Sequence, residues 1–282
     1  MEPSVIIAII TRGRIDRQKT LQNLPEPMRG LVTLVCHPGE KADHAKRWGD
    51  QVADIVEAPA SEDNIGKVRH WVIEHFDADV TIFMDDDLEF CTRIEPDLVP
   101  ATNKSGLYTI KDGIFSEERR IEVLTDMFGW MIENLSSGEY GMVGINARQN
   151  SNFQPEFEEC TRLVTMWGVN KELYNSLPIT IADFAVKEDF AITLAFLTNG
   201  IKNLKTSRWV YNTPDSNGSG GCSIYRTLEM SDQSAYFLAE CFPEYVRVVE
   251  RSNKNWKGEF EKAATRKEVQ IQWKKAYEDG CK

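Results

Sequence analysis

Three consecutive aspartates, Asp85, Asp86 and Asp87, directly follow the apolar run Thr81–Met84. Carboxylates crowded in this way repel one another unless a cation neutralises them. In an extended chain alternate side chains share a face, so Asp85 and Asp87 would converge on one ion while Asp86 points away. Oxygen donors of this kind suit Mg²⁺ or Mn²⁺, which hold phosphates through one or two carboxylates. The alternative is an acidic turn that only ends a strand.

Two further segments carry side chains suited to a nucleotide. The turn Thr11–Arg14 follows the first apolar run, where backbone amides and two guanidinium groups could contact a base or phosphates. The segment Asn64–Arg69 begins the helix that leads to the aspartates, with Asn64 as its expected N-cap. Lys67 and Arg69 could face a diphosphate. Each could also be an exposed helix charge, and this reading has equal weight for Lys67.

A Glu-Asp pair, Glu188 and Asp189, begins an amphipathic segment that ends in Asn199-Gly200. The pattern predicts a helix over 188–199. Acidic residues in a first helical turn complement the helix dipole. That explanation accounts for the residue types, but it does not explain a pairing with the aspartate cluster far earlier in the chain.

Alternating β-branched and helical segments must position these residues. The predicted strands are 5–10, 31–36, 54–56, 81–84 and 142–145, with extended segments at 160–169 and 201–211. The predicted helices are 17–23, 42–49, 64–76 and 116–134, the last capped by Ser116. This alternation predicts an α/β fold with a doubly wound, largely parallel sheet. Ligands bind such sheets outside the carboxyl ends of the strands, which is where the candidate residues lie.

Together, and in this order, these landmarks resemble the GT-A glycosyltransferases, particularly the inverting group similar to family 2. The resemblance covers about residues 4–212 and implies a Rossmann-like, mixed and mostly parallel sheet flanked by helices. It implies that Asp85 and Asp87 hold Mn²⁺ or Mg²⁺ on the diphosphate of a nucleotide sugar, and that Asp189 is the catalytic base. The expected nucleotide contacts are Thr11, Arg12, Arg14, Asn64, Lys67, Arg69, Asp85 and Asp86.

One feature departs from the family pattern. Many relatives use a later histidine as a metal ligand, and no histidine follows Asp189. The third protein ligand is therefore open, with Asp215 as a weak candidate. The segment Trp167–Tyr174 resembles the strand and turn on the acceptor side of the family.

The segment Asn212–Thr227 resembles more narrowly the TET-associated glycosyltransferases of phages, which modify 5-hydroxymethylpyrimidines in DNA. Its glycine-rich part is expected to be a loop that closes over the donor, with Tyr225 and Arg226 reaching the diphosphate or the acceptor. The resemblance implies a UDP-sugar as donor and 5-hydroxymethylcytosine in DNA as acceptor. A single displacement by the acceptor hydroxyl would invert the anomeric centre.

Charge limits how a DNA acceptor can bind. The chain has 33 basic and 44 acidic residues, a net charge of −11, so the protein as a whole repels polyanions and needs a local basic patch. Residues 245–282 carry a net charge of +4, with Trp256 and Trp273 nearby. A solvated helical face is the alternative reading of this stretch. Its basic side chains include Arg247, Arg251, Lys254, Lys257, Arg266, Lys274 and Lys275.

Three parts of the chain are predicted. Residues 1–212 form the core that binds nucleotide sugar and acceptor, 213–244 form a glycine-rich active-site loop and helix, and 245–282 form a basic, helical C-terminal extension packed on the core. No apolar run approaches the roughly 20 residues of a membrane span. The six cysteines are scattered, without a Cys-x-x-Cys pair, which favours a reducing cytoplasm, that of the host if a phage encodes the protein. The oligomeric state is not indicated.

Four alternatives remain. A glycosyltransferase could act on a saccharide, protein or lipid instead of DNA. A nucleotidyltransferase usually has a glycine-rich loop with a lysine after the first strand. This sequence has only Arg12-Gly13-Arg14 there. A haloacid-dehalogenase-like phosphatase would carry its nucleophile after the first strand. A binding module without chemistry would have little use for both Asp87 and Asp189.

Overall fold

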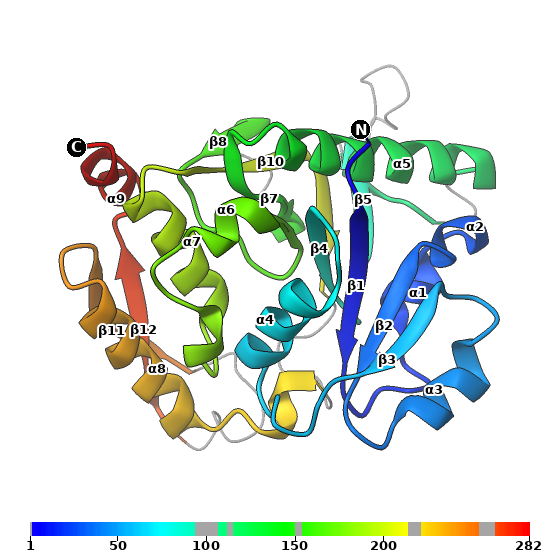
Figure 1. The fold of residues 1–282 in the computed structure, drawn as a ribbon, viewed down its shortest axis with the longest axis horizontal. Helices are drawn as coiled ribbons and strands as arrows, with labels where there is room; N and C mark the ends of the chain where they lie inside the picture. Colours follow the sequence, from blue (N-terminus) through cyan, green and yellow to red (C-terminus); the bar gives the residue numbers. More distant parts are fainter. Residues whose placement is uncertain (1, 94–106, 112–114, 150–153, 214–220, 254–262) are drawn as a thin grey trace.

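A mixed sheet, with ten strands among the residues that the structure describes, forms the centre of the protein (Figure 1). The computed structural model describes residues 2–93, 107–111, 115–149, 154–213, 221–253 and 263–282. The strands of the sheet are β1 (Val5–Thr11), β2 (Val32–Cys36), β3 (Asp54–Glu57), β4 (Val80–Asp85), β5 (Glu89–Arg93), β6 (Leu107–Thr109), β7 (Tyr140–Ala147), β8 (Phe157–Glu159), β9 (Trp167–Asn170) and β10 (Lys202–Asn212).

The strand order is β3-β2-β1-β4-β9-β7-β10-β5-β6, and β8 pairs with β10. The strands β3, β2, β1 and β4 are parallel to one another, whereas β9 runs antiparallel to both β4 and β7. Across the sheet β5, β8 and β9 run against the other seven strands. The predicted mixed, mostly parallel α/β sheet is therefore confirmed.

Helices cover both faces of the sheet. They are α1 (Lys19–Asn23), α2 (Glu26–Arg29), α3 (Lys41–Trp48), α4 (Ile65–His75), α5 (Glu117–Ser136), α6 (Lys171–Asn175), α7 (Glu188–Thr198), α8 (Leu228–Cys241) and α9 (Trp273–Gly280). Ile7 and Ile9 of β1 belong to the apolar cluster that includes α5, and Ala8 between them belongs to the cluster that includes α4 and α7. Adjacent strand residues point to opposite faces, and both faces of β1 are covered, which is why the strand is apolar from Val5 to Ile10.

The predicted helix and strand positions in the first half agree with the structure to within a few residues. Ser116 caps α5 by accepting a hydrogen bond from the Arg119 amide at 3.3 Å. The segment 160–169 is a strand only from Trp167, because Cys160 and Thr165 adopt left-handed backbone conformations. Much of the predicted glycine-rich loop, residues 214–220, lies outside the described residues.

Gly66 lets α4 approach the segment before α7. A Cβ atom at this position would lie 2.1 Å from the carbonyl oxygen of Phe184 and 2.5 Å from that of Ile181. Ile181 begins the short 3₁₀ helix η3 (Ile181–Asp183). A side chain at Gly66 would therefore push α4 away from the segment that leads to Glu188.

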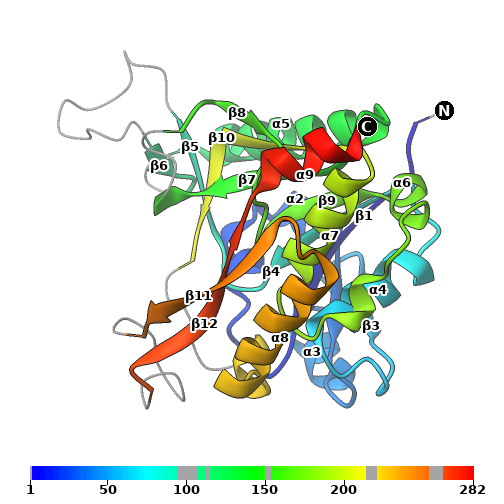
Figure 2. The same cartoon turned by 90° about the vertical axis from the view of Figure 1, so that its left-hand side faces the viewer.

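The helical C-terminal extension predicted from the sequence is correct only for α9. Residues 246–271 instead contain an antiparallel pair, β11 (Val246–Ser252) and β12 (Thr265–Ile271), which lies beside α8 (Figure 2). Val246 pairs with Ile271 and Val248 with Val269, so these four apolar residues share one face with the period of two that a strand requires. Within the described ranges, no helix has both the length and the apolar character needed to cross a membrane.

Candidate active site

The three aspartates lie where β4 ends. The strand stops at Asp85, and Asp86 and Asp87 form a turn, so the alternation of an extended chain does not extend through them. The buried Asp86 carboxylate accepts hydrogen bonds from the Thr11 hydroxyl at 2.6 Å and from Arg14. The same Arg14 guanidinium donates to Asp87 at 3.1 Å. This turn is thereby joined to the loop after β1, because parallel neighbours end at the same edge of the sheet.

Asp85 is held from the opposite side by Arg69. The Arg69 side chain is 5% exposed and donates to Asp85 Oδ1 at 3.2 Å and to Glu188 Oε1. Its guanidinium also lies 5.0 Å from the centre of the Trp167 ring. Charge-assisted hydrogen bonds of a buried arginine fix both distance and orientation. Arg69 therefore connects the aspartates of β4 to the Glu-Asp pair of α7.

One cavity of about 730 Å³ contains both ends of this connection. Asp85, Arg69, Glu188 and Asp189 all line it. Its volume lies within the range of roughly 300–1,000 Å³ found for small-molecule sites. Asp87 is not part of its lining and lies beside Asp85 on the Arg14 side.

Burial raises the pKa of three carboxyl groups that line the cavity, those of Asp85, Glu188 and Asp189. The pKa of Asp85 rises to about 7 because burial and three nearby carboxylates disfavour its charge, against the opposing charge of Arg69; solvent still reaches it through the cavity. Burial also raises the pKa of Glu188 to about 7 and raises that of Asp189. Perturbed groups gathered in one cavity are typical of functional sites.

Tyr225 brings a further predicted segment to the same region. Its hydroxyl accepts a hydrogen bond from the Ile65 amide at 3.0 Å, at the start of α4. The Arg12 guanidinium lies 5.7 Å from the centre of the Tyr225 ring. Arg226, the next residue, lines the cavity. The loop after β1, the start of α4 and the segment at 225–226 therefore lie together.

Asn64 and Lys67 have different surroundings. Asn64 caps α4 by accepting a hydrogen bond from the Lys67 amide at 3.1 Å, which confirms the predicted N-cap. The Lys67 ammonium is exposed and pairs with Asp63 at 3.0 Å. Lys67 is thus bound to its own helix start instead of the cavity.

The side chains beside Asp85 fit a hard divalent cation with few protein ligands. Asp85 Oδ1 bonds Arg69 and Asp87 Oδ2 bonds Arg14, so each carboxylate has a second oxygen for a cation. In the part of the chain that the structure describes, no group of three or more His, Cys, Asp or Glu side chains could hold a metal. Mg²⁺ bound by one or two carboxylates completes its shell with phosphate oxygens and water. Asp215 lies outside the described residues.

Sequence reasoning missed Arg162, Thr165 and Tyr211. Arg162 lines the cavity with its guanidinium 4.7 Å from the centre of the Phe190 ring, and its charge opposes the rise in the pKa of Asp189. Thr165 lines the cavity with φ 68°, a conformation uncommon for a β-branched residue. Burial raises the pKa of the nearby Tyr211 to about 12. A single charged residue, Arg162, in the otherwise uncharged stretch 160–169 was the available signal.

Replacing Arg69 by methionine is expected to lower the free energy of unfolding by about 3–5 kcal/mol, since Glu188 would become an uncompensated buried charge. Urea denaturation monitored by circular dichroism measures this loss. The double variant Arg69→Met/Glu188→Gln should recover part of it. Lys67→Met on the same helix is the matched control and should stay within about 1 kcal/mol of the parent, because the Lys67–Asp63 pair is exposed. A loss below about 1 kcal/mol for Arg69→Met would contradict the structural role of this ion pair.

Comparison with solved structures places this architecture among the GT-A glycosyltransferases. The glucosyl-3-phosphoglycerate synthase of Mycobacterium tuberculosis, solved with Mn²⁺, uridine diphosphate and phosphoglyceric acid, is 12% identical with a TM-score of 0.51, over 88% of this chain and 83% of that one. TarS 1–349 of S. aureus in complex with UDP-GlcNAc is 12% identical with a TM-score of 0.49, over 84% of this chain and 66% of that one. At these identities the likeness concerns the fold.

A sequence model of the TET-associated glycosyltransferases matches residues 5–202. The chain belongs to this family and is a glycosyltransferase. No curated protein sequence matches it. Family membership excludes the nucleotidyltransferase, the phosphatase and the binding module without chemistry.

Proposed function

We propose that this glycosyltransferase transfers a sugar from a UDP-sugar to the hydroxymethyl group of 5-hydroxymethylcytosine in DNA, with inversion at the anomeric carbon. The observation that supports the proposal is that Asp85 and Asp189 line the same cavity. Arg69, which bonds Asp85, also lines it. The family to which the chain belongs supports the choice of DNA as the acceptor.

Asp189 is the proposed general base. Its carboxylate is fixed by a hydrogen bond from the Phe190 amide at 2.9 Å, and it faces the cavity from the first turn of α7. It would take the proton of the hydroxymethyl group as the oxygen attacks the anomeric carbon, from the face opposite the departing diphosphate. Burial raises its pKa toward the working pH, which strengthens it as a base.

Binding of the donor is assigned to the other side of the cavity. Asp85 and Asp87 would hold Mg²⁺ or Mn²⁺, which when bound neutralises charge on the leaving diphosphate. Arg12, Arg14 and the amides at the start of α4 would orient the nucleotide. Arg226 would contact the diphosphate or the acceptor from the cavity wall.

Mass spectrometry tests the acceptor directly. DNA containing 5-hydroxymethylcytosine is incubated with the protein, Mn²⁺ or Mg²⁺ and a panel of nucleotide sugars, and matched DNA containing cytosine serves as control. We expect a gain of one sugar mass on the modified base only. If the modified base gains no sugar mass with any donor, DNA is rejected as the acceptor. Saccharide, protein and lipid acceptors would then be tested.

The pH dependence of transfer should report on Asp189. Because the base acts as a carboxylate, kcat rises with pH until Asp189 is deprotonated, and its raised pKa moves this limb above the range of an ordinary aspartate. Arg162→Gln removes a charge that lowers this pKa, so the limb should move to higher pH. Arg208→Gln removes a similar exposed guanidinium that lies over Trp209, and should leave the midpoint unchanged. An unchanged midpoint in Arg162→Gln would show that Arg162 does not influence the pKa of the catalytic base.

A further inference from the structure

Three cavities share lining residues, and together they are called the depression below. The active-site cavity shares Arg162, Val164 and Thr165 with a second cavity of about 280 Å³. It shares Trp273 with a third cavity of about 350 Å³ at the start of α9. The cavity that contains Asp189 therefore lies between the other two, and a ligand longer than a nucleotide sugar could follow the depression through it.

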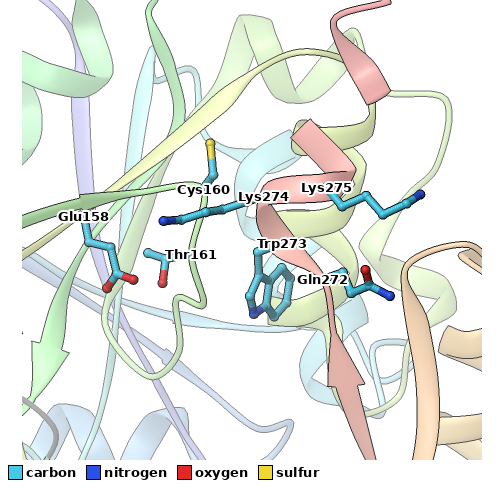
Figure 3. Close-up of a pocket in the computed structure, with 7 residues that line it drawn as sticks. All are labelled: Glu158, Cys160, Thr161, Gln272, Trp273, Lys274 and Lys275. Carbon is cyan, nitrogen blue, oxygen red and sulfur yellow. The ribbon is translucent and has the colours of Figure 1, made fainter. Parts of the chain in front are cut away.

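The third cavity distinguishes two neighbouring lysines. Figure 3 shows Lys274 extending across this cavity toward Thr161 and Glu158, whereas Lys275 extends to the other side of α9. Lys275 is bonded to Asp279 at 2.7 Å. Lys274 thus directs its charge into the depression, and the charge of Lys275 is already compensated.

The hairpin β11–β12 forms another wall of the depression. Lys187, which precedes the Glu-Asp pair, bonds Glu268 of β12 at 3.0 Å and so attaches the hairpin to the start of α7. Arg251 and Arg266 line the active-site cavity and are direct partners in the ladder between the two strands. Like charges directly opposite each other destabilise a strand pair. Arg266 is paired with Glu268 at 3.6 Å, and an anion bound beside Arg251 would relieve the remaining repulsion.

Cations without a carboxylate partner surround the depression. Arg162, Arg251 and Lys274 are exposed, and none forms an ion pair with any carboxylate among the described residues. Two nearby carboxylates already have lysine partners, since Glu268 bonds Lys187 and Glu158 bonds Lys205 at 2.9 Å. Arg162 also acts electrostatically on Asp189, without an ion pair between them among the described residues. A protein of net charge −11 therefore places three cations that form no ion pair in the described ranges along this depression.

We propose that Arg162, Arg251 and Lys274 bind phosphates of the acceptor DNA strand on either side of the target base, while that base enters the cavity beside Asp189. This inference rests on the proposed function. A base must leave its stack to reach Asp189, so the depression would hold the target strand with that base extruded. Arg251 and Lys274 lie beyond residues 5–202, the part of the chain that the family model matches, so the family does not assign them this role.

Fluorescence anisotropy with a labelled, unmodified single-stranded oligonucleotide tests the surface without any transfer step. In the double variant Arg251→Gln/Lys274→Gln we expect binding at low salt to weaken roughly tenfold or more, and the slope of log Kd against log salt to fall by about 1.4, since each lost phosphate contact removes about 0.7. The charge-preserving variant Arg251→Lys/Lys274→Arg should bind like the parent. Lys46→Gln removes an exposed charge on α3, on the opposite side of the molecule from α9 (Figure 1), and should also bind like the parent.

Kinetics with DNA containing 5-hydroxymethylcytosine gives the second readout. The double variant should raise KM for DNA by a factor similar to its loss of affinity, with a much smaller effect on kcat. Parental affinity and an unchanged salt slope in the double variant would overturn the inference and leave the proposed function intact. If no donor modifies the DNA but oligonucleotide binding still depends on Arg251 and Lys274, the proposed function fails and the phosphate-binding surface stands. A parent protein that does not bind the oligonucleotide at low salt would overturn the inference.

Discussion

The variant Asp189→Asn is expected to transfer sugar about 10²–10⁴-fold more slowly than the parent, the usual contribution of a general base. Asparagine keeps the size of the side chain but cannot accept the proton of the attacking hydroxyl. The rate is measured as sugar incorporated into DNA containing 5-hydroxymethylcytosine, by mass spectrometry of the digested nucleosides.

Two measurements make this result specific to the chemical step. Calorimetry of UDP binding in the presence of Mn²⁺ should give a similar affinity for Asp189→Asn and the parent, because the diphosphate is assigned to the Asp85 side of the cavity. Asp183→Asn, an exposed carboxyl of η3 just before α7, is the matched control and should retain the parental rate. Transfer at the parental rate by Asp189→Asn would mean that another group is the base.

The variant Asp87→Asn is expected to weaken the Mn²⁺-dependent binding of UDP about 100-fold or more, because loss of groups that only orient metal ligands already costs about 10–100-fold. The amide of asparagine has nearly the same size as the carboxylate and still forms hydrogen bonds, but it lacks the negative charge. Isothermal titration calorimetry with and without Mn²⁺ separates this effect from direct contacts to the nucleotide.

A chelator and a distant carboxyl complete the test of the metal site. EDTA should reduce the affinity of the parent for UDP to that of Asp87→Asn, and Asp87→Asn should then respond little to Mn²⁺. Asp77→Asn changes an exposed carboxyl before the opposite end of β4 and should behave as the parent does. Intact Mn²⁺-dependent binding in Asp87→Asn would reject the assignment of Asp87 as a ligand.

The Arg69 connection links these two predictions physically. Arg69 bonds Asp85 and Glu188 at once, so the donor side and the proposed base share one buried cation. A change in charge at either end alters the field at the other, as the rise of the pKa of Asp85 in the presence of Asp189 already indicates. Loss of Arg69 should therefore impair both UDP binding and transfer, apart from its effect on stability.

Much of the sheet was predictable because its signals are local. A β-branched apolar run such as Val5–Ile10 fits a strand covered on both faces. Asn64 and Ser116 begin helices by capping the N-termini with their own side chains. The antiparallel strand β9 in the middle of the sheet was not predictable in this way, because strand direction depends on connections made far along the chain.

The C-terminal hairpin shows where local pattern was misread. Charged residues between Val246 and Ile271 resembled a solvated helix face, yet the period of the apolar residues is two. The error had a functional consequence, because a strand pair turns Arg251 and Arg266 toward the active-site cavity.

The sequence by itself determined which residue types stand after which strands: aspartates after β4, arginines after β1 and a Glu-Asp pair at the start of α7. These features depend on neighbours only a few positions away, which fix strand ends and helix caps. Only the tertiary structure decided that Arg69 joins Asp85 to Glu188, that Arg162 lies beside Asp189, and that the β11–β12 hairpin walls the cavity. Those contacts join segments distant in the chain, and they exist because packing at positions such as Gly66 allows close approach.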